Sequence, residues 1–372
     1  MVSEDPIYRE LHKKIDESMP VGFPASDEGL EIRLLEMLFT PEEAKIAVHL
    51  GALPEPLKRI NRRVNKGGIS IEISKLEEVL DNLVEKGAIM GGPLLDDKEK
   101  NIKRYSLAQW AVGMYEFQVG RMTKEFAELA NKYICETFYK EFHRKDTPPQ
   151  IHTIPVEKSL TPEHHIGTYD NIRDIVMNKV EKIALIDCVC RQEHDILEEP
   201  CKLSDIRRCC VMFNDLAEAT IENSTGKEVS KDEFFDILDK YQKEGFVLQP
   251  QNNQNPLFMC ICCGCCCGVL IMAKKFPKPA EYYLSNFYAQ SDPELCNGCE
   301  TCLKRCQMDA ITMVDEKSIV DLDRCIGCGN CIVTCGMKAM SLIKREEEVV
   351  PAKDMDDMYQ KIMQKKIRYV EH

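Results

Sequence analysis

The protein has 372 residues, 44% of them hydrophobic and 30% charged, which is enough for two or three globular domains. Its net charge of −13 argues against non-specific binding to nucleic acid or anionic membranes, and no apolar run approaches the ~18 residues of a transmembrane helix. The first residues lack the apolar core of a signal peptide, so we expect a cytoplasmic protein without membrane insertion. In that reducing compartment, the clustered cysteines among the 20 should bind metal.

Residues 1–110 are predicted to form a mainly helical domain with no paired cysteines. Apolar spacing and cap signals predict helices in DEGLEIRLLEMLF, TPEEAKIAVHLG, PLKRINRRVNK and ISKLEEVLDNLVEKG. The apolar segments AIMGGPLL and IKRYSLAQW flank the polar DDKEKN, which predicts a hairpin. Helices followed by a hairpin resemble a winged-helix domain, a class that often binds DNA.

The helix that would enter DNA in such a domain, residues 74–87, is acidic. Its charged residues are Lys75, Lys86, Glu77, Glu78, Asp81 and Glu85. Because phosphates repel this surface, we expect no nucleic-acid partner. The preceding helix is basic, with Lys58, Arg59, Arg62, Arg63 and Lys66, so an iron–sulfur, redox-sensing winged-helix regulator is an alternative function.

Residues 111–150 are predicted to be a helical connector, in which Cys135 is a core residue. The segment RKDTPPQIHTIPVEKS is predicted to be a linker, and residues 151–288 a cysteine-rich α/β domain. In this domain IALID should form a buried strand, with GFVLQP as its neighbour.

The central domain contains eleven cysteines in two groups, too crowded to pair as disulfides. They are Cys188, Cys190, Cys201, Cys209 and Cys210, and then Cys260, Cys262, Cys263, Cys265, Cys266 and Cys267 in MCICCGCCCG. Because neighbouring side chains of an extended segment point to opposite sides, we expect one loop to serve two metal sites, completed by upstream cysteines.

In that interpretation, Cys260, Cys263 and Cys266 keep a C-x2-C-x2-C spacing and bind one cluster, while Cys262 and Cys265 face another. Leu270 stands where a fourth cysteine would follow. We therefore predict one or two further iron–sulfur clusters. A non-cubane cluster, or a zinc site with spare thiols, is the alternative.

Residues 289–345 contain the motif C-x2-C-x2-C-x3-C twice, as CNGCETCLKRC and CIGCGNCIVTC, offset by 29 residues. The fourth cysteine of each motif should ligate the other cluster. We expect one 4Fe-4S cluster on Cys296, Cys299, Cys302 and Cys335, and a second on Cys325, Cys328, Cys331 and Cys306. Structural zinc sites are the alternative.

This region closely resembles the bacterial two-cluster ferredoxin domain, which implies a small α+β module that passes single electrons. That family usually has proline after the fourth cysteine, where this chain has Gln307 and Gly336. Residues 346–372 are predicted to form a charged helical tail. The predicted fold class is therefore α+β and multidomain.

We find no dinucleotide fingerprint, P-loop or nucleophile elbow, and we assign no catalytic residue. The whole chain resembles large 4Fe-4S dicluster proteins of anaerobes. We therefore expect an electron-transfer subunit, rather than a stand-alone enzyme, in a cytosolic anaerobic oxidoreductase complex, with a protein redox partner or catalytic subunit. An enzyme that reduces a thiol or disulfide at a central cluster is a further alternative.

Overall fold

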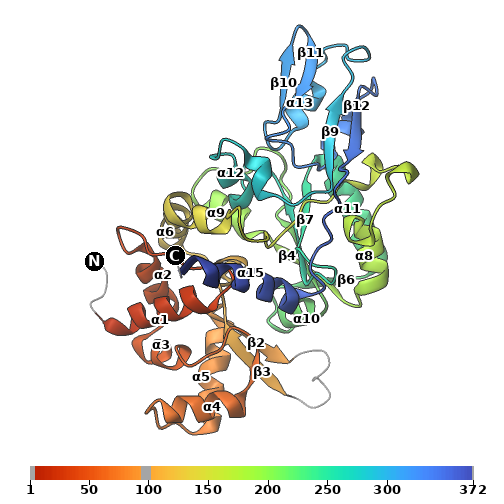
Figure 1. The fold of residues 1–372 in the computed structure, drawn as a ribbon. Helices are drawn as coiled ribbons and strands as arrows, with labels where there is room; N and C mark the ends of the chain where they lie inside the picture. Colours follow the sequence, from red (N-terminus) through yellow and green to blue (C-terminus); the bar gives the residue numbers. More distant parts are fainter. Residues whose placement is uncertain (1–4, 94–101, 371–372) are drawn as a thin grey trace. The chain divides into compact units, whose positions relative to one another are not determined.

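The computed structural model describes residues 5–93 and 102–370 (Figure 1). The chain forms two compact units. Unit 1 comprises Met1–Phe142, Asp187–Glu199 and Glu218–Gly226, and unit 2 comprises His143–Ile186, Pro200–Ala217 and Lys227–His372. No helix within the described residues has the length and hydrophobicity needed to cross a membrane.

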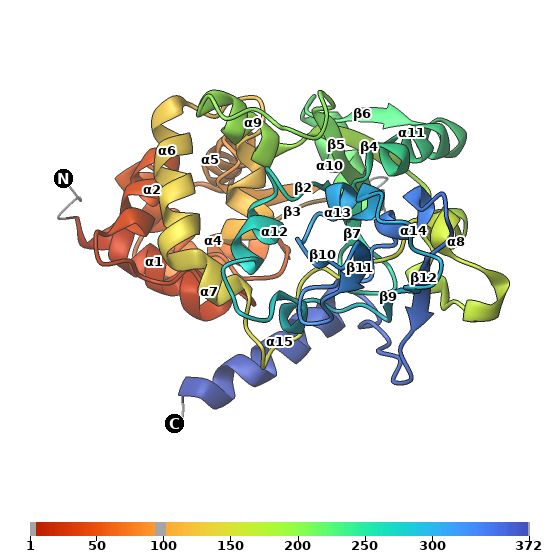
Figure 2. The same cartoon turned by 90° about the horizontal axis from the view of Figure 1, so that it is seen from above.

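Unit 1 is mainly helical, and its helices are α1 (Pro6–Ser18), α2 (Leu30–Leu38), α3 (Pro41–Ala47), α4 (Leu57–Lys66), α5 (Ile73–Glu85), α6 (Lys124–Tyr133), α7 (Tyr139–Phe142) and α9 (Val189–Ile196). The helices predicted between residues 27 and 87 are confirmed as α2 to α5. Thr40 and Glu43 form a capping box at the start of α3. Helices α1, α2 and α6 lie side by side (Figures 1 and 2).

The predicted hairpin is also confirmed, because β2 (Ile89–Pro93) pairs antiparallel with β3 (Lys103–Leu107). With β1 (Glu55–Pro56) they form a sheet in the order β1-β3-β2. The segment DDKEKN lies outside the described residues. Cys135 lies in the helical turn Ile134–Phe138 and is half-buried, so it is less enclosed than predicted.

Unit 2 is built on a sheet in the order β6-β4-β5-β8-β7. Its strands are β4 (Ile183–Asp187), β5 (Arg208–Phe213), β6 (Lys227–Val229), β7 (Val247–Pro250) and β8 (Phe258–Cys262). Its helices are α8 (Ile172–Lys179), α11 (Lys231–Glu244), α12 (Gly268–Ala273) and α15 (Met355–Val370), and α10 (Asn214–Glu222) begins in it. The predicted helical tail is confirmed from Met355 onward.

Two expectations about unit 2 are wrong. GFVLQP forms β7, but β5 and β8 separate it from β4, because these strands contain cysteines that obscured their pattern. The segment 144–159 is not a linker. Its apolar residues Ile151 and Ile154 are buried and bridge to β7 and the residue after it, which ties this irregular segment to the sheet.

The rest of unit 2 is a duplicated module. Strand β9 (Phe287–Ser291) pairs with β12 (Met340–Lys344), and β10 (Ile311–Val314) pairs with β11 (Lys317–Val320). Helix α13 (Thr301–Arg305) and helix α14 (Asn330–Thr334) start and end 29 residues apart, the same offset as the cysteine motifs. The duplication seen in the sequence is therefore a structural repeat.

Two side chains of this module hold it to the central sheet. The Arg305 guanidinium donates to the carbonyl oxygens of Gln242 (3.1 Å) and Glu244 (2.9 Å), at the end of α11. The Asn330 amide, fully buried, donates to the carbonyl oxygens of Gly245 (3.0 Å) and Phe246 (3.1 Å). These bonds bring side-chain donors to carbonyl oxygens in the last turn of α11 and in the two residues that follow it.

Candidate metal centres

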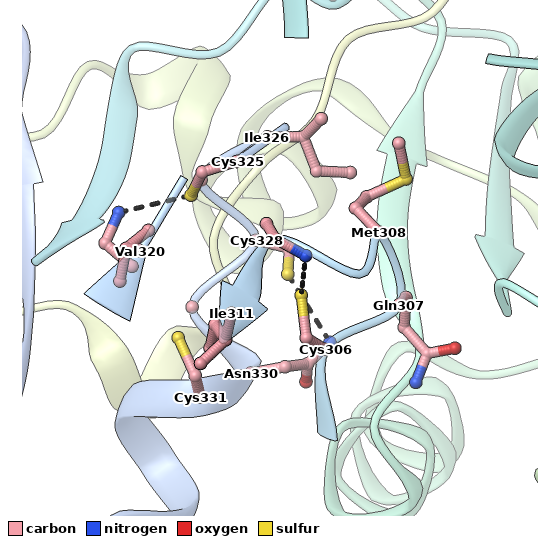
Figure 3. Close-up of a pocket in the computed structure, with 14 residues that line it drawn as sticks. Cys306, Gln307, Met308, Ile311, Val320, Cys325, Ile326, Cys328, Asn330 and Cys331 are labelled. Atoms are coloured by element: carbon pink, nitrogen blue, oxygen red, sulfur yellow. Dashed lines mark hydrogen bonds between the residues drawn. The ribbon is translucent and has the colours of Figure 1, made fainter. Parts of the chain in front are cut away.

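One candidate centre is a hollow lined by cysteines from both motifs (Figure 3). Its cysteines are Cys306, Cys325, Cys328 and Cys331. Cys306 directly follows α13, whereas the other three come from the loop before α14 and from α14 itself. Apolar side chains, including Ile311 and Ile326, line the remaining wall. Four thiols around one hollow are the donor set of a 4Fe-4S cluster.

The second hollow has the complementary set of cysteines. They are Cys296, Cys299, Cys302 and Cys335. Met337 and Met340 also line this hollow, and Cys299 is exposed. The structure therefore brings together the same eight cysteines, in the same two sets, that the motif spacing suggested.

Backbone amides point at sulfur in both hollows. Ala310 N–H donates to Cys306 Sγ (3.3 Å), and Ala339 N–H donates to Cys335 Sγ (3.2 Å), so the 29-residue repeat extends to this hydrogen bond. Ser318 N–H donates in the same way to Cys296 Sγ (3.4 Å). Such donors stabilise thiolates, as an iron-bound cysteine requires.

The two hollows differ in their electrostatics. In the hollow that contains Cys306 and Cys328, called the inner hollow, burial raises the pKa of Cys306 and raises the pKa of Cys328 to about 12. In the other hollow, called the outer hollow, a hydrogen bond from the Ser318 hydroxyl lowers the pKa of Cys296, and one from the Thr301 hydroxyl lowers the pKa of Cys299. A buried thiolate is stable only near a positive charge, and a bound iron would supply that charge. The buried cysteines of the inner hollow therefore also suit a metal.

A third candidate centre lies in the central region. Its members are Cys201, Cys263, Cys265 and Cys266, whose sulfur atoms all lie within 4.8 Å of one another. Cys201 Sγ is 3.7 Å from both Cys263 Sγ and Cys265 Sγ, and Cys265 Sγ is 3.6 Å from Cys263 Sγ. A loop before β5 supplies Cys201, and the turn after β8 supplies the others. Cys201 thus contacts the six-cysteine run although it precedes Cys263 by 62 residues.

The predicted division of that run is wrong. Cys265 lies with Cys263 and Cys266, whereas Cys260 and Cys262 lie on β8. The alternation of side chains holds only within a strand, and β8 ends at Cys262. Beyond it the chain turns and gathers Cys263, Cys265 and Cys266 on one side.

The other upstream cysteines are not members of this group among the described residues. Cys188 precedes α9 and Cys190 lies in its first turn, both in unit 1. Cys209 and Cys210 are neighbours on β5 and are buried. Cys201 is the upstream cysteine that joins the central group within the described residues. Iron ligation by the remaining upstream cysteines stays a prediction.

A hydrogen bond joins the central turn to the duplicated module. Gly264 N–H, between the central cysteines, donates to Gln307 Oε1 (2.8 Å), and Gln307 follows Cys306. Lys274 Nζ donates to the Gly264 carbonyl oxygen (3.3 Å) and forms an ion pair with Asp309 (3.0 Å). The substitution of Gln307 for the usual proline was the sequence signal for this contact.

Two four-thiol hollows in a duplicated module, beside a central thiol group, define an iron–sulfur protein. Residues 288–336 match the family of 4Fe-4S dicluster domains, and this range contains all eight cysteines of the two motifs. The chain thus contains a 4Fe-4S dicluster domain, and the match covers this module alone. No curated protein matches the chain.

Proposed function

We propose that the protein is an electron relay with two 4Fe-4S clusters and at least one central metal centre. The cysteine sets of the two hollows would hold the clusters, and each bound cluster would accept or release one electron. The protein's own residues supply thiolates, donate N–H groups to sulfur, and exclude water from the inner hollow through Ile311 and Ile326.

The observation that carries this proposal is the contact between Gly264 and Gln307. It places the turn that bears Cys263 and Cys265 against the residue next to Cys306. Cys262 and Cys267 also pack in one apolar cluster with cysteines of the duplicated module. Continuous packing between thiol groups is what a relay requires, because the electron never has to cross water.

The spacing of the central sulfurs indicates the kind of centre that suits Cys201, Cys263, Cys265 and Cys266. Tetrahedral bonds of ~2.3 Å from one ion set its four sulfur ligands roughly 3.8 Å apart. Four of the distances between these sulfur atoms are 3.6 to 3.8 Å, and all of them are within 4.8 Å. A cube binds its cysteines through four different irons and needs a wider arrangement, so the group as folded fits one iron ion.

Metal analysis and EPR of the full chain, purified without oxygen, test the relay. We expect about eight irons and about eight sulfides from two clusters, with iron in excess of sulfide from the central centre. Cys263→Ser should remove iron from this excess alone, and Cys135→Ser, which alters a cysteine outside both motifs and the central group, should remove none. Stoichiometric zinc, lost in Cys263→Ser, would make the central centre structural and limit the relay to the dicluster domain.

We further propose that the N-terminal helices and the β1-β3-β2 sheet act as a winged-helix-like docking module for a protein. The sheet order and the preceding α4 and α5 support this interpretation. On α5, Lys75 is paired with Glu78 (2.8 Å), and Lys103 of β3 is paired with Asp81 (2.6 Å). These pairs leave little positive charge for phosphates on α5, the helix that would enter DNA, which favours a basic protein partner over DNA.

The expected partner is a catalytic subunit or redox protein of a cytosolic anaerobic oxidoreductase complex. Carboxylates of the dicluster domain would steer it toward the exposed Cys299. They are Asp292, Glu294, Glu300, Asp315, Glu316, Asp321 and Asp323. With a basic cytochrome as probe, electron transfer should slow as salt rises, because screening weakens the attraction. A salt-independent rate would contradict this steering, and tight binding to a defined DNA operator would favour the regulator instead.

A further inference from the structure

The central sheet carries a second group of thiols, distinct from the group around Cys201. On β5 and β8, Cys210 and Cys260 are direct partners in the antiparallel register, so their side chains lie on one face of the sheet. Cys262, two residues further along β8, shares that face. Three thiols are therefore fixed together by strand pairing alone.

A fourth thiol comes from the residue that precedes α12. The Cys262 thiol lies within hydrogen-bonding reach of the thiols of both Cys260 and Cys267. Cys210, Cys262 and Cys267 are buried, and Cys260 is half-buried. Cys267 caps the backbone of α12, so it reaches this group from outside the sheet.

A buried amide faces the same thiols. Gln249 on β7 is the register partner of Cys260, so Cys210, Cys260 and Gln249 form one row across three neighbouring strands. The Gln249 side chain is fully buried, and among the described residues neither its nitrogen nor its oxygen makes a hydrogen bond of normal length and angle, although the Tyr283 hydroxyl lies beside it. Leaving a buried amide without such bonds is unfavourable, and a bound acceptor would relieve that cost.

The surroundings of this group favour a soft, redox-active metal. Cys262 and Cys267 belong to an apolar cluster that also includes Cys302, Cys325 and Cys331 of the dicluster domain. Val247, the register partner of Cys262, is part of the same cluster. Four soft donors in an apolar site select iron or zinc over hard cations. Because this group packs against cysteines of the dicluster domain, redox-active iron suits an electron relay better than zinc does.

We propose that Cys210, Cys260, Cys262 and Cys267 bind a second central iron centre, to which Gln249 donates a hydrogen bond. The six-cysteine run then divides three and three: Cys263, Cys265 and Cys266 complete one centre with Cys201, and Cys260, Cys262 and Cys267 complete another with Cys210. The run is crowded because one short segment serves two sites. This proposal rests on the proposed function only in taking iron as the metal.

Metal content and low-temperature EPR of three full-length variants test the division. Cys262→Ser and Cys263→Ser should each lose iron from one centre, and the double variant should lose both amounts, while the signals of the dicluster domain persist. Wild-type iron content in Cys262→Ser would overturn the proposal. So would a double variant that loses no more than either single variant, because the six cysteines would then serve one centre.

Two further variants keep the test independent of folding defects. Cys267 lies outside the strands, so Cys267→Ser should remove the same iron as Cys262→Ser without disturbing strand pairing, and full retention would overturn the proposal. Gln249→Leu should retain that iron but lower its midpoint potential, because N–H···S bonds stabilise the reduced state. An unchanged potential would overturn the role of Gln249. Absence of the dicluster signals from the wild type would contradict the proposed function instead.

Discussion

Gln307 accepts a hydrogen bond of 2.8 Å from the backbone N–H of Gly264, and this bond connects the dicluster domain to the central thiol turn. Gln307 is buried and also donates through Nε2 to the Arg305 carbonyl oxygen (3.2 Å). Proline, the usual residue after the fourth ferredoxin cysteine, has no side-chain acceptor. The departure from the ferredoxin pattern at Gln307 therefore has a structural role.

Replacing Gln307 by alanine should weaken this connection. Gly264 N–H would lose its acceptor in a partly buried site, which costs about 1–3 kcal/mol. We expect a lower melting temperature under anaerobic conditions, with the iron of both dicluster sites retained. Gln307→Glu keeps an acceptor oxygen at this position and should melt closer to the wild type. Equal melting of Gln307→Ala and the wild type would show that the bond contributes nothing.

A methyl group at Gly264 should disrupt the same contact by sterics. An added Cβ would lie 2.2 Å from the Gln307 carbonyl oxygen, closer than van der Waals contact permits. Gly264→Ala should therefore shift the turn and lower the iron bound by Cys263 and Cys265, as measured by metal analysis.

Gly336, which follows Cys335, provides the matched control for Gly264. Nothing lies within 4 Å of a Cβ added there, so Gly336→Ala should leave the metal content unchanged. If both alanine variants retained full iron content, the turn would not depend on close packing against Gln307.

Arg305 should stabilise the junction between α13 and α11. Its guanidinium donates to the carbonyl oxygens of Gln242 and Glu244 in the last turn of α11. Arg305→Ala should speed amide hydrogen exchange in the last turn of α11 and in β7. The neighbouring Lys304 is exposed, so Lys304→Ala should not. The same exchange pattern in both variants would rule out a specific role for Arg305.

Glu193 should make the stability of the protein depend on pH. Burial raises its pKa to about 7, although the Tyr115 hydroxyl donates to it and opposes the rise. The folded state thus holds a proton that the unfolded state releases above its ordinary pKa of 4.5. Stability must therefore fall as pH rises from about 4.5 to about 7, by up to ~3 kcal/mol.

Glu193→Gln keeps an acceptor for Tyr115 but carries no titrating proton. The variant should gain stability relative to the wild type as pH rises through this window, measured as the difference between their melting temperatures at about pH 5.5 and at about pH 7.5. A difference that does not change with pH would mean that Glu193 is ionised in the folded protein.

The dicluster domain could be predicted from sequence because its information is local. Cysteines separated by two residues supply three ligands of each cluster from one short loop, and the 29-residue repeat indicates that the fourth ligand comes from the other motif. The predicted helices from α2 to α5 are confirmed for a similar reason, since apolar spacing and caps such as Thr40 with Glu43 act within one helix.

The central region depended on contacts that no local pattern contains. Cys201 joins Cys263 across 62 residues, and the division of the six-cysteine run follows from where β8 ends, at Cys262. The strand order could also not be predicted from the sequence, because cysteines in β5 and β8 interrupt the apolar pattern of the two strands that separate β4 from β7. Spacing along the chain shows which residues can bind metal, but only strand pairing and turns decide which sulfurs meet.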